Sequence, residues 1–294
     1  MEKTKVTKAI IPLAGLGTRF LPLSKLLAKE FWPLVDTPVV HYIIEEAVNS
    51  GIKDITFVVR PGDRKIAKYF TRDARLEQDL KKRKKFDLLK LLRKMESFSK
   101  KANFSFAYQH QALGDGHAVL QAKKIAKKQP CLVLFGDDIV CSSVPCAKQL
   151  INVYNKQEKP IIALCKMPKN KLSSYGIVKV EKAGKRLYKI KGIVEKPSPK
   201  EAPSNLAVVG KYIIDKDVFH FLENTPSIAK GEIRLAGAFN EMIKRDMTIF
   251  GYEFEGDWLE CGNKTAYLKS NLYLSLKHPQ FGKELKKYLK SLKV

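Results

Sequence analysis

A glycine-containing segment follows the first apolar run of the chain. Residues 9–13 are apolar. The five residues that come next are Ala14, Gly15, Leu16, Gly17 and Thr18. Glycines let the backbone approach a ligand closely, and consecutive amide N–H groups can form a nest that binds phosphate oxygens. Phe20 stands where the dinucleotide fingerprint has its third glycine, and the GK[ST] ending of a P-loop is missing. The segment predicts a phosphate-binding turn, with a turn that binds nothing as the alternative.

Three cations follow this turn within eleven residues, at Arg19, Lys25 and Lys29. Pro22 and Pro33 interrupt any continuous helix through the same stretch. Backbone dipoles together with fixed positive charges suit a triphosphate, whose leaving group gains negative charge as its bond breaks. We therefore expect a triphosphate-binding loop, and an exposed basic loop is the alternative.

Two carboxylates follow the apolar run 131–135, at Asp137 and Asp138. An aspartate at the carboxyl end of a strand is well placed to hold Mg²⁺, which prefers oxygen ligands and keeps several waters. An isolated pair of aspartates can equally form a turn or cap a helix.

The elements that must position these residues alternate between short apolar runs and amphipathic segments of helical length. This rhythm predicts an α/β fold with a mixed, mostly parallel, Rossmann-like sheet flanked by helices. We expect strands over residues 8–13, 55–59, 104–108 and 131–135. We expect helices over residues 39–50, 64–70, 76–100 and 117–128. Ligands of such sheets bind beyond the carboxyl ends of the strands, where the candidate residues lie.

The second half of the chain is rich in short β segments. These segments cover residues 161–167, 176–182, 187–194, 206–214 and 247–254. A helical pattern begins near residue 264. We expect these strands to extend the same sheet and to build a lid for a second substrate, followed by a C-terminal helical arm.

The composition is that of a folded, strongly basic protein. The chain has 294 residues, 45% of them hydrophobic, and a net charge of +25. Residues 81–101 hold ten Lys and Arg against Asp87 and Glu96. Such a charge attracts nucleic acid, anionic lipid or a polyphosphate substrate, with solvated helix faces as the alternative. Five irregularly spaced cysteines and the lack of an apolar run of roughly 20 residues predict reduced thiols, no membrane span and a cytoplasmic location.

Residues 15–47, GLGTRFLPLSKLLAKEFWPLVDTPVVHYIIEEA, resemble the N-terminal signature of the sugar-1-phosphate nucleotidylyltransferases. Within that family they are most similar to the bacterial UTP–glucose-1-phosphate uridylyltransferases. The resemblance implies that residues 14–18 bind the nucleotide and that Arg19 and Lys29 are the catalytic cations. Ala28 replaces a proline of the family pattern, which puts the presentation of Lys29 in question.

Further segments match the same family in order. Residues 109–118 resemble its uridine-reading segment, which implies that Gln109 and Gly114 bind the base. Asp137 corresponds to a Mg²⁺ ligand, and Asp138 to its support. Glu260 takes the place of the aspartate that is the second ligand, with Asp257 close in sequence as a fallback.

The family's sugar-phosphate site maps onto the second half, at Gly176, Glu195 and Lys196. Lys211 replaces an arginine of the family pattern, and Gly237 replaces an aspartate. These two departures lose a planar guanidinium and a carboxylate, respectively.

The resemblance implies a Mg²⁺-assisted transfer of uridylyl from UTP to glucose 1-phosphate, without a covalent intermediate, by a homodimer or homotetramer. It implies one domain over 1–294, with a nucleotide-binding half (7–140), a sugar-binding half (141–263) and a helical arm (264–294). One alternative is a transferase that uses another nucleoside triphosphate or another sugar 1-phosphate. The other is a protein with the transferase fold and weakened catalysis that binds nucleic acid or has a regulatory role.

Overall fold

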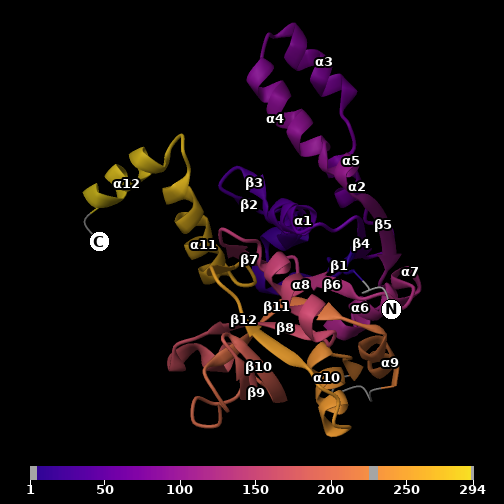
Figure 1. Cartoon of the computed structure of the whole chain (residues 1–294). Coiled ribbons are helices and arrows are strands. Elements are labelled where there is room, and N and C mark those ends of the chain that lie inside the picture. Colours follow the sequence, from indigo (N-terminus) through magenta and orange to yellow (C-terminus); the bar gives the residue numbers. More distant parts are fainter. Residues whose placement is uncertain (1–4, 225–230, 293–294) are drawn as a thin grey trace.

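The computed structural model describes residues 5–224 and 231–292 (Figure 1). At its centre lies a nine-stranded sheet in the order β5-β4-β1-β6-β11-β8-β12-β10-β9. The strands in that order are Asn103–Tyr108, Asp54–Val59, Lys8–Pro12, Cys131–Leu134, Leu206–Ile214, Ile161–Lys166, Phe250–Glu253, Leu187–Glu195 and Gly176–Gly184. The first four are parallel to one another, whereas β11 runs antiparallel to both β6 and β8. The predicted α/β class is confirmed, and the β segments of the second half extend the same sheet.

Side chains of the central strands alternate between two hydrophobic clusters. On β1, Ile11 belongs to one cluster and Ile10 to the other, and on β6 the same holds for Leu132 and Val133. Successive side chains of a strand point to opposite faces, so the sheet is buried on both sides. This is why the strands read as continuous apolar runs.

Helices cover both faces of the sheet. On one face lie α1 (Val39–Asn49) and α8 (Cys146–Gln157), whose apolar residues share a cluster with Ile11. On the other face lie α6 (Asp115–Gln121), α9 (Lys216–Asn224) and α10 (Leu235–Lys244). The sequence pattern did not single out α8, α9 or α10.

The basic stretch expected as one helix over 76–100 is a helical hairpin, and that expectation is wrong. It contains α3 (Ala74–Lys82), α4 (Phe86–Glu96) and the short α5 (Phe98–Lys101). Lys84 adopts a left-handed conformation with φ 53° and reverses the chain. The Glu77 carboxylate accepts hydrogen bonds from Arg72 and Arg93, which ties the two helices together. Figure 1 shows the hairpin extending away from the sheet.

The helix expected over 117–128 is also interrupted. It forms α6 and the four-residue α7 (Lys123–Ala126), and the chain then passes through two left-handed residues, Lys127 and Lys128. The short α2 (Lys65–Phe70) lies close to its predicted position.

Two further elements complete the chain. A small antiparallel sheet pairs β7 (Asp138–Cys141) with β13 (Asp257–Glu260), so that Asp138 lies opposite Glu260. The C-terminal helices are α11 (Lys264–Lys277) and α12 (Gly282–Ser291), as the helical pattern from residue 264 predicts. The five cysteines are free. Within residues 5–224 and 231–292, no helix has the length and apolar character needed to cross a membrane.

Candidate active site

A cavity of about 330 Å³ opens beyond the carboxyl ends of β1, β5 and β6. Lys29, Gln109, Gly114 and Asp137 line it together with the whole segment 14–18. Arg19 lines an adjoining cavity of about 370 Å³, which shares Gly15, Gly17, Thr18, Lys29 and Asp137 with the first. Lys25 contributes to neither lining. The fold therefore brings together the nucleotide-side residues that the sequence singles out, except Lys25 and the glutamate at 260, which is described below.

The two glycines of the nest have different reasons to be glycine. Gly17 has φ 63°, a left-handed conformation that favours glycine, and it precedes the short 3₁₀ turn Thr18–Phe20, whose Phe20 N–H donates to the Gly17 carbonyl at 2.9 Å. A Cβ on Gly15 would meet no atom within 4 Å, so its backbone faces open space. A ligand can therefore approach the backbone closely at Gly15.

An aromatic cluster anchors this loop from behind. The buried ring of Phe20 packs edge-on against Trp32 at 4.5 Å between centroids, and Trp32 packs against Tyr267 of α11 at 5.2 Å. Ala28 has φ −57° and ψ 142°, values that a proline also adopts. The replacement of proline at this position therefore leaves the backbone that presents Lys29 in the same shape.

Gln109 is held at the wall of the cavity with only 5% of its surface exposed. Its Nε2 donates to the carbonyl of Gly114 at 3.1 Å and lies 2.9 Å from Nδ1 of His117. Gly114 has φ 101°, and a Cβ there would lie 2.5 Å from the carbonyl oxygen of Ile233. Glycine is therefore required at 114, and the amide of Gln109 is oriented by its neighbours.

A second segment of the chain closes the wall of the cavity beside Gln109. Ile233 donates its N–H to Leu113 at 2.7 Å, and its carbonyl accepts from His117 at 3.2 Å. Asp115, which replaces an apolar residue of the family pattern, accepts from the N–H of Leu235 at 3.0 Å. Gly237 in α10 replaces the aspartate of the family pattern. The carboxylate of Asp115 reaches the start of the same helix from α6 instead.

Lys29 and Asp137 form an ion pair at the cavity. Burial acts to lower the pKa of Lys29, but the carboxylates of Asp137, Glu30 and Asp138 together more than offset it, so that this pKa is raised and the amine stays charged. Arg19 reaches the carbonyl of Gly262 with its Nη1 at 3.4 Å. Both cations line the second cavity together with Asp137 and Gly262.

The carboxylates of Asp137 and Glu260 converge at Gly262. A Cβ on Gly262 would lie 3.1 Å from Oδ2 of Asp137 and 3.5 Å from Oε1 of Glu260. Glu260 is oriented on both oxygens, because Oε2 accepts from the Tyr175 hydroxyl at 2.7 Å and Oε1 from Asn263 at 3.0 Å. In the described part of the chain, no three His, Cys, Asp or Glu side chains gather into a metal cluster. Two carboxylates suffice for Mg²⁺ when phosphates and waters supply the other ligands.

The fallback carboxylate lies elsewhere. Asp257 begins the same strand, β13, and its exposed carboxylate accepts from the Tyr273 hydroxyl of α11. Successive residues of a strand alternate between its two faces, which separates Asp257 from Glu260.

Asp138 is a buried supporting residue. Its carboxylate accepts from the Trp258 indole at 2.7 Å and from the N–H of Gly210 at 3.2 Å. Burial and the neighbouring Asp137 raise its pKa to about 7. Lys211, fully buried, pairs with Glu46 at 2.7 Å, and the other oxygen of Glu46 accepts from Ala147 at the start of α8. The lysine that replaces the family's arginine therefore has a partner inside the core.

The three sugar-side residues lie together on the hairpin of β9 and β10. Gly176 pairs with Glu195 in register, and a Cβ on Gly176 would lie 3.1 Å from Oε1 of Glu195. Lys196 has φ 47° and donates its N–H to the Tyr175 carbonyl at 3.0 Å. None of the three belongs to the lining of the two nucleotide-side cavities that the described residues form. Glu195 is still close enough to raise the pKa of Asp115, after the larger effect of burial.

Several residues at this site are not among those that the sequence analysis singles out. Tyr175 and Asn263 orient Glu260 from positions 85 and 3 residues away. Glu30 lines the cavity with 3% of its surface exposed, and burial raises its pKa to about 7. His117 holds Gln109. Only the sequence context of Tyr175, next to Gly176, could have pointed to it.

Comparisons with known proteins agree with the motifs. Residues 8–275 match the protein family described as nucleotidyl transferase. A UTP–glucose-1-phosphate uridylyltransferase from Streptococcus pyogenes is 40% identical over 291 residues, which cover 97% of this chain and 94% of that protein.

Solved structures give the same result. The UTP-bound UDP-glucose pyrophosphorylase of Acinetobacter baumannii has a TM-score of 0.89 at 37% identity, and the match covers 98% of this chain and all of that one. A UDP-glucose pyrophosphorylase complexed with UDP-glucose has a TM-score of 0.83 at 32% identity, covering 93% of this chain and all of that one.

Proposed function

The chain belongs to the nucleotidyl transferase family and, within it, to the UTP–glucose-1-phosphate uridylyltransferases, and from this premise we propose how its residues perform the reaction. The enzyme transfers a uridylyl group from UTP to glucose 1-phosphate and yields UDP-glucose and pyrophosphate. The observation that carries the residue assignments is the convergence of the glycine nest, the Lys29–Asp137 ion pair and Glu260 around adjoining cavities.

The reaction needs no nucleophile from the protein. A phosphate oxygen of glucose 1-phosphate attacks the α-phosphorus of UTP, and the bond from that phosphorus to the bridging oxygen of the pyrophosphate breaks. The attacking oxygen is already anionic, so no proton has to be removed from it. Burial raises the pKa of the Cys131 thiol to about 12, which keeps it protonated and inert. Catalysis is then positioning together with electrostatic stabilisation.

Lys29 and Arg19 neutralise the charge that grows on the departing pyrophosphate. The open backbone at Gly15 and the turn at Gly17 supply N–H donors to the phosphate chain. Lys29 is already charged and held within the cavity, so little reorganisation is needed when the triphosphate binds.

Asp137 and Glu260 would hold a divalent cation, and we assign Mg²⁺ as the cation. The donor set fits, because both carboxylates are hard oxygen ligands, they approach one point near Gly262, and Tyr175 and Asn263 orient the longer side chain. When bound, Mg²⁺ would supply positive charge next to the phosphates. Lys29 would then exchange Asp137 for a phosphate oxygen.

Gln109 reads the uracil, and the β9–β10 hairpin binds the sugar phosphate. The amide of Gln109 offers a donor and an acceptor to the base edge, and a base with the opposite pattern leaves buried polar groups unpaired. Glu195 binds sugar hydroxyls, Lys196 binds the sugar phosphate, and Gly176 leaves room for Glu195.

The division of the chain into three parts follows from these residue roles. We assign residues 7–140 to the nucleotide, 141–263 to the sugar and 264–294 to a helical arm within a single domain. We further propose that the enzyme works in the cytoplasm as a homodimer or homotetramer.

Pyrophosphate release tests the proposal directly. The full chain is assayed with each of the four common nucleoside triphosphates against the 1-phosphates of glucose, galactose and N-acetylglucosamine, with Mg²⁺ and with EDTA. We expect release with UTP and glucose 1-phosphate, and only when Mg²⁺ is present. Release that is undiminished in EDTA would refute the cation assignment, and a preference for another nucleotide would refute the role of Gln109.

A further inference from the structure

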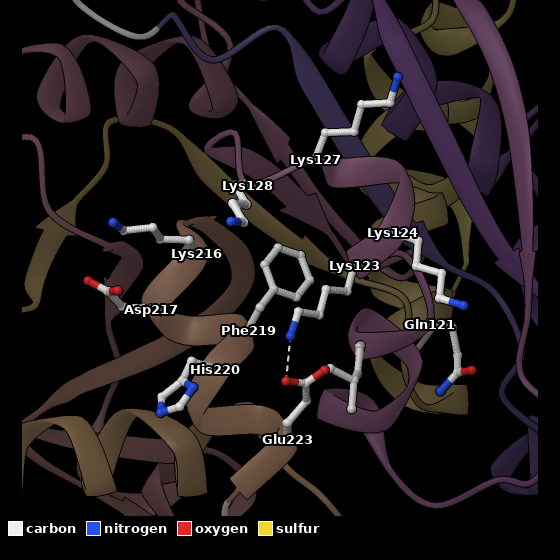
Figure 2. Close-up of a pocket in the computed structure, with 11 residues that line it drawn as sticks. Gln121, Lys123, Lys124, Lys127, Lys128, Lys216, Asp217, Phe219, His220 and Glu223 are labelled. Carbon is white, nitrogen blue, oxygen red and sulfur yellow. Dashed lines mark hydrogen bonds and ion pairs between the residues drawn. The ribbon is translucent and has the colours of Figure 1, made fainter.

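A large cavity lies away from the site described above. It has a volume of about 1060 Å³ and opens between α7 and α9, with the end of α6 beside it (Figure 2). We call it the lysine groove. Its lining consists of Leu120, Gln121, Lys123, Lys124, Lys127, Lys128, Lys216, Asp217, Phe219, His220 and Glu223.

The lysine groove carries uncompensated positive charge. Five lysines line it against two carboxylates, and Lys123 already pairs with Glu223. The other four lysines have no carboxylate partner in the described part of the chain. Figure 2 shows Lys123 reaching across to Glu223, while Lys124, Lys127 and Lys216 extend outward in different directions. Like charges repel, so an anion that bridges these flexible ammonium groups lowers their mutual repulsion.

Phosphates are the anions that this lining suits. Lysine binds phosphate as a compact point charge with three donors, and several lysines around one cavity match a ligand with several phosphates. A polynucleotide would in addition need rings on which its bases can stack. The lining holds two rings, of which Phe219 is only 2% exposed and offers no face, so that the exposed His220 alone cannot stack successive bases. The lysine groove therefore favours a small, multiply phosphorylated molecule over nucleic acid.

The end of α6 connects this groove to the uracil-reading residue. Nε2 of Gln121 lies 3.1 Å from Nε2 of His117, whose Nδ1 lies 2.9 Å from Nε2 of Gln109. The same glutamine nitrogens also donate to the carbonyls of His117 and Gly114, so both face the imidazole as donors. A neutral imidazole has one donor and one acceptor, and it cannot accept from both. The two glutamines therefore compete for one acceptor.

A ligand in the lysine groove resolves this competition. Burial lowers the pKa of His117, which favours the neutral ring, and a contact with the backbone of Gln111 has a smaller, opposite effect. A phosphate that accepts from the amide of Gln121 withdraws this donor from the ring. Nδ1 of His117 is then free to accept from Gln109, which fixes the amide of Gln109 in one orientation.

We propose that the lysine groove binds a small, multiply phosphorylated metabolite, and that Gln121 and His117 transmit its binding to Gln109, so that the enzyme binds uridine more tightly. The proposed binding of the metabolite does not depend on the proposed function, whereas the proposed effect on uridine rests on the role of Gln109 in that function.

Calorimetric titration with inorganic tripolyphosphate tests the binding. The full chain is first saturated with UDP-glucose in EDTA, so that the nucleotide cavity is filled and no turnover occurs. We expect the wild type to bind tripolyphosphate, and Lys124→Glu with Lys128→Glu to weaken binding by about tenfold or more. The matched control carries Lys286→Glu and Lys287→Glu on exposed positions of α12 and keeps wild-type affinity.

Three outcomes would overturn the site. These are no binding by the wild type, an equal loss in the α12 control, and a groove variant that loses affinity for a short single-stranded RNA but not for tripolyphosphate. The last of these outcomes would assign the groove to nucleic acid instead.

The effect on the base is measured with uridine, which carries no phosphate. We expect tripolyphosphate to raise the affinity for uridine about fivefold or more in the wild type. Gln121→Leu should still bind tripolyphosphate and should lose this effect. An undiminished effect in Gln121→Leu would refute the transmission through His117. Pyrophosphate release without tripolyphosphate, assayed in parallel, reports the proposed reaction separately from both results.

Discussion

The ammonium of Lys29 donates to the carboxylate of Asp137 across 108 residues of sequence. The catalytic cation and the first metal ligand of the proposed mechanism are therefore one ion pair before either meets its ligand. The pair helps to keep the lysine charged and holds it inside the cavity, where the proposed mechanism requires positive charge against the leaving group.

Lys29→Met should lower turnover more than it weakens nucleotide binding. We expect kcat to fall by about 10²- to 10³-fold, because a preorganised charge at the leaving group is lost. The affinity for UTP, measured calorimetrically in EDTA, should fall much less. The affinity of Mn²⁺ for the nucleotide-free enzyme, followed by electron paramagnetic resonance, should rise because a competing cation is removed from Asp137.

Lys25→Met is the matched control for this prediction, since Lys25 lies in the same loop but lines neither cavity. Its kcat should stay near that of the wild type. Losses of similar size in kcat and in UTP affinity for Lys29→Met would count against a role at the leaving group.

Tyr175→Phe should weaken the metal site without touching a metal ligand. The hydroxyl orients Oε2 of Glu260 at 2.7 Å, and loss of such a supporting hydrogen bond typically costs about 10- to 100-fold in metal affinity or activity. We expect a higher Mg²⁺ concentration at half-maximal rate. Glu260→Asp should be more severe, because the shorter side chain cannot keep both Tyr175 and Asn263 as partners.

Tyr273→Phe provides the control for Tyr175→Phe. Its hydroxyl also donates to a carboxylate, but to the exposed Asp257 outside the site. The Mg²⁺ dependence should therefore remain that of the wild type. An Mg²⁺ dependence that changes equally in both variants would mean that neither hydroxyl acts through Glu260.

Glu30→Gln should stabilise the protein more at pH 8 than at pH 5. Burial raises the pKa of Glu30 from 4.5 to about 7, so the folded state holds a proton that the unfolded state releases between these values. Stability is thus lost as pH rises from about 4.5 to 7, by up to about 3 kcal/mol from this group. Thermal unfolding at both pH values measures it, with the exposed Glu284→Gln on α12 as the control. An equal gain at both pH values would contradict the buried, protonated carboxyl.

The sequence predicts the carboxyl ends of the strands well, because a buried parallel strand is a continuous run of apolar residues and the candidate site residues come directly after such a run. Asp137, Gln109 and the nest were placed at one edge of the sheet on this ground. The approach of Glu260 could not be derived from the residues, since it depends on the β7–β13 ladder, and only the family resemblance supplied it.

Two turns escaped prediction because ordinary lysines make them. Lys84 reverses the basic hairpin, and Lys127 and Lys128 end α7, all in left-handed conformations without glycine, asparagine or proline at those positions. The lysine groove could not be predicted from the sequence either. Its two walls are about a hundred residues apart in sequence, and only their packing against one sheet face makes a shared surface.

Asp115 and Gly237 should behave as a compensating pair. Asp115→Leu leaves the N–H of Leu235 at the start of α10 without its acceptor, at a cost of about 1 to 2 kcal/mol. Gly237→Asp returns a carboxylate to the first turn of that helix and removes a helical glycine. Urea unfolding of the two single variants and the double variant gives their coupling. We expect Gly237→Asp to stabilise the Asp115→Leu background more than the wild type, in which two carboxylates would share one helix start. Equal gains in both backgrounds would show that the two positions are independent.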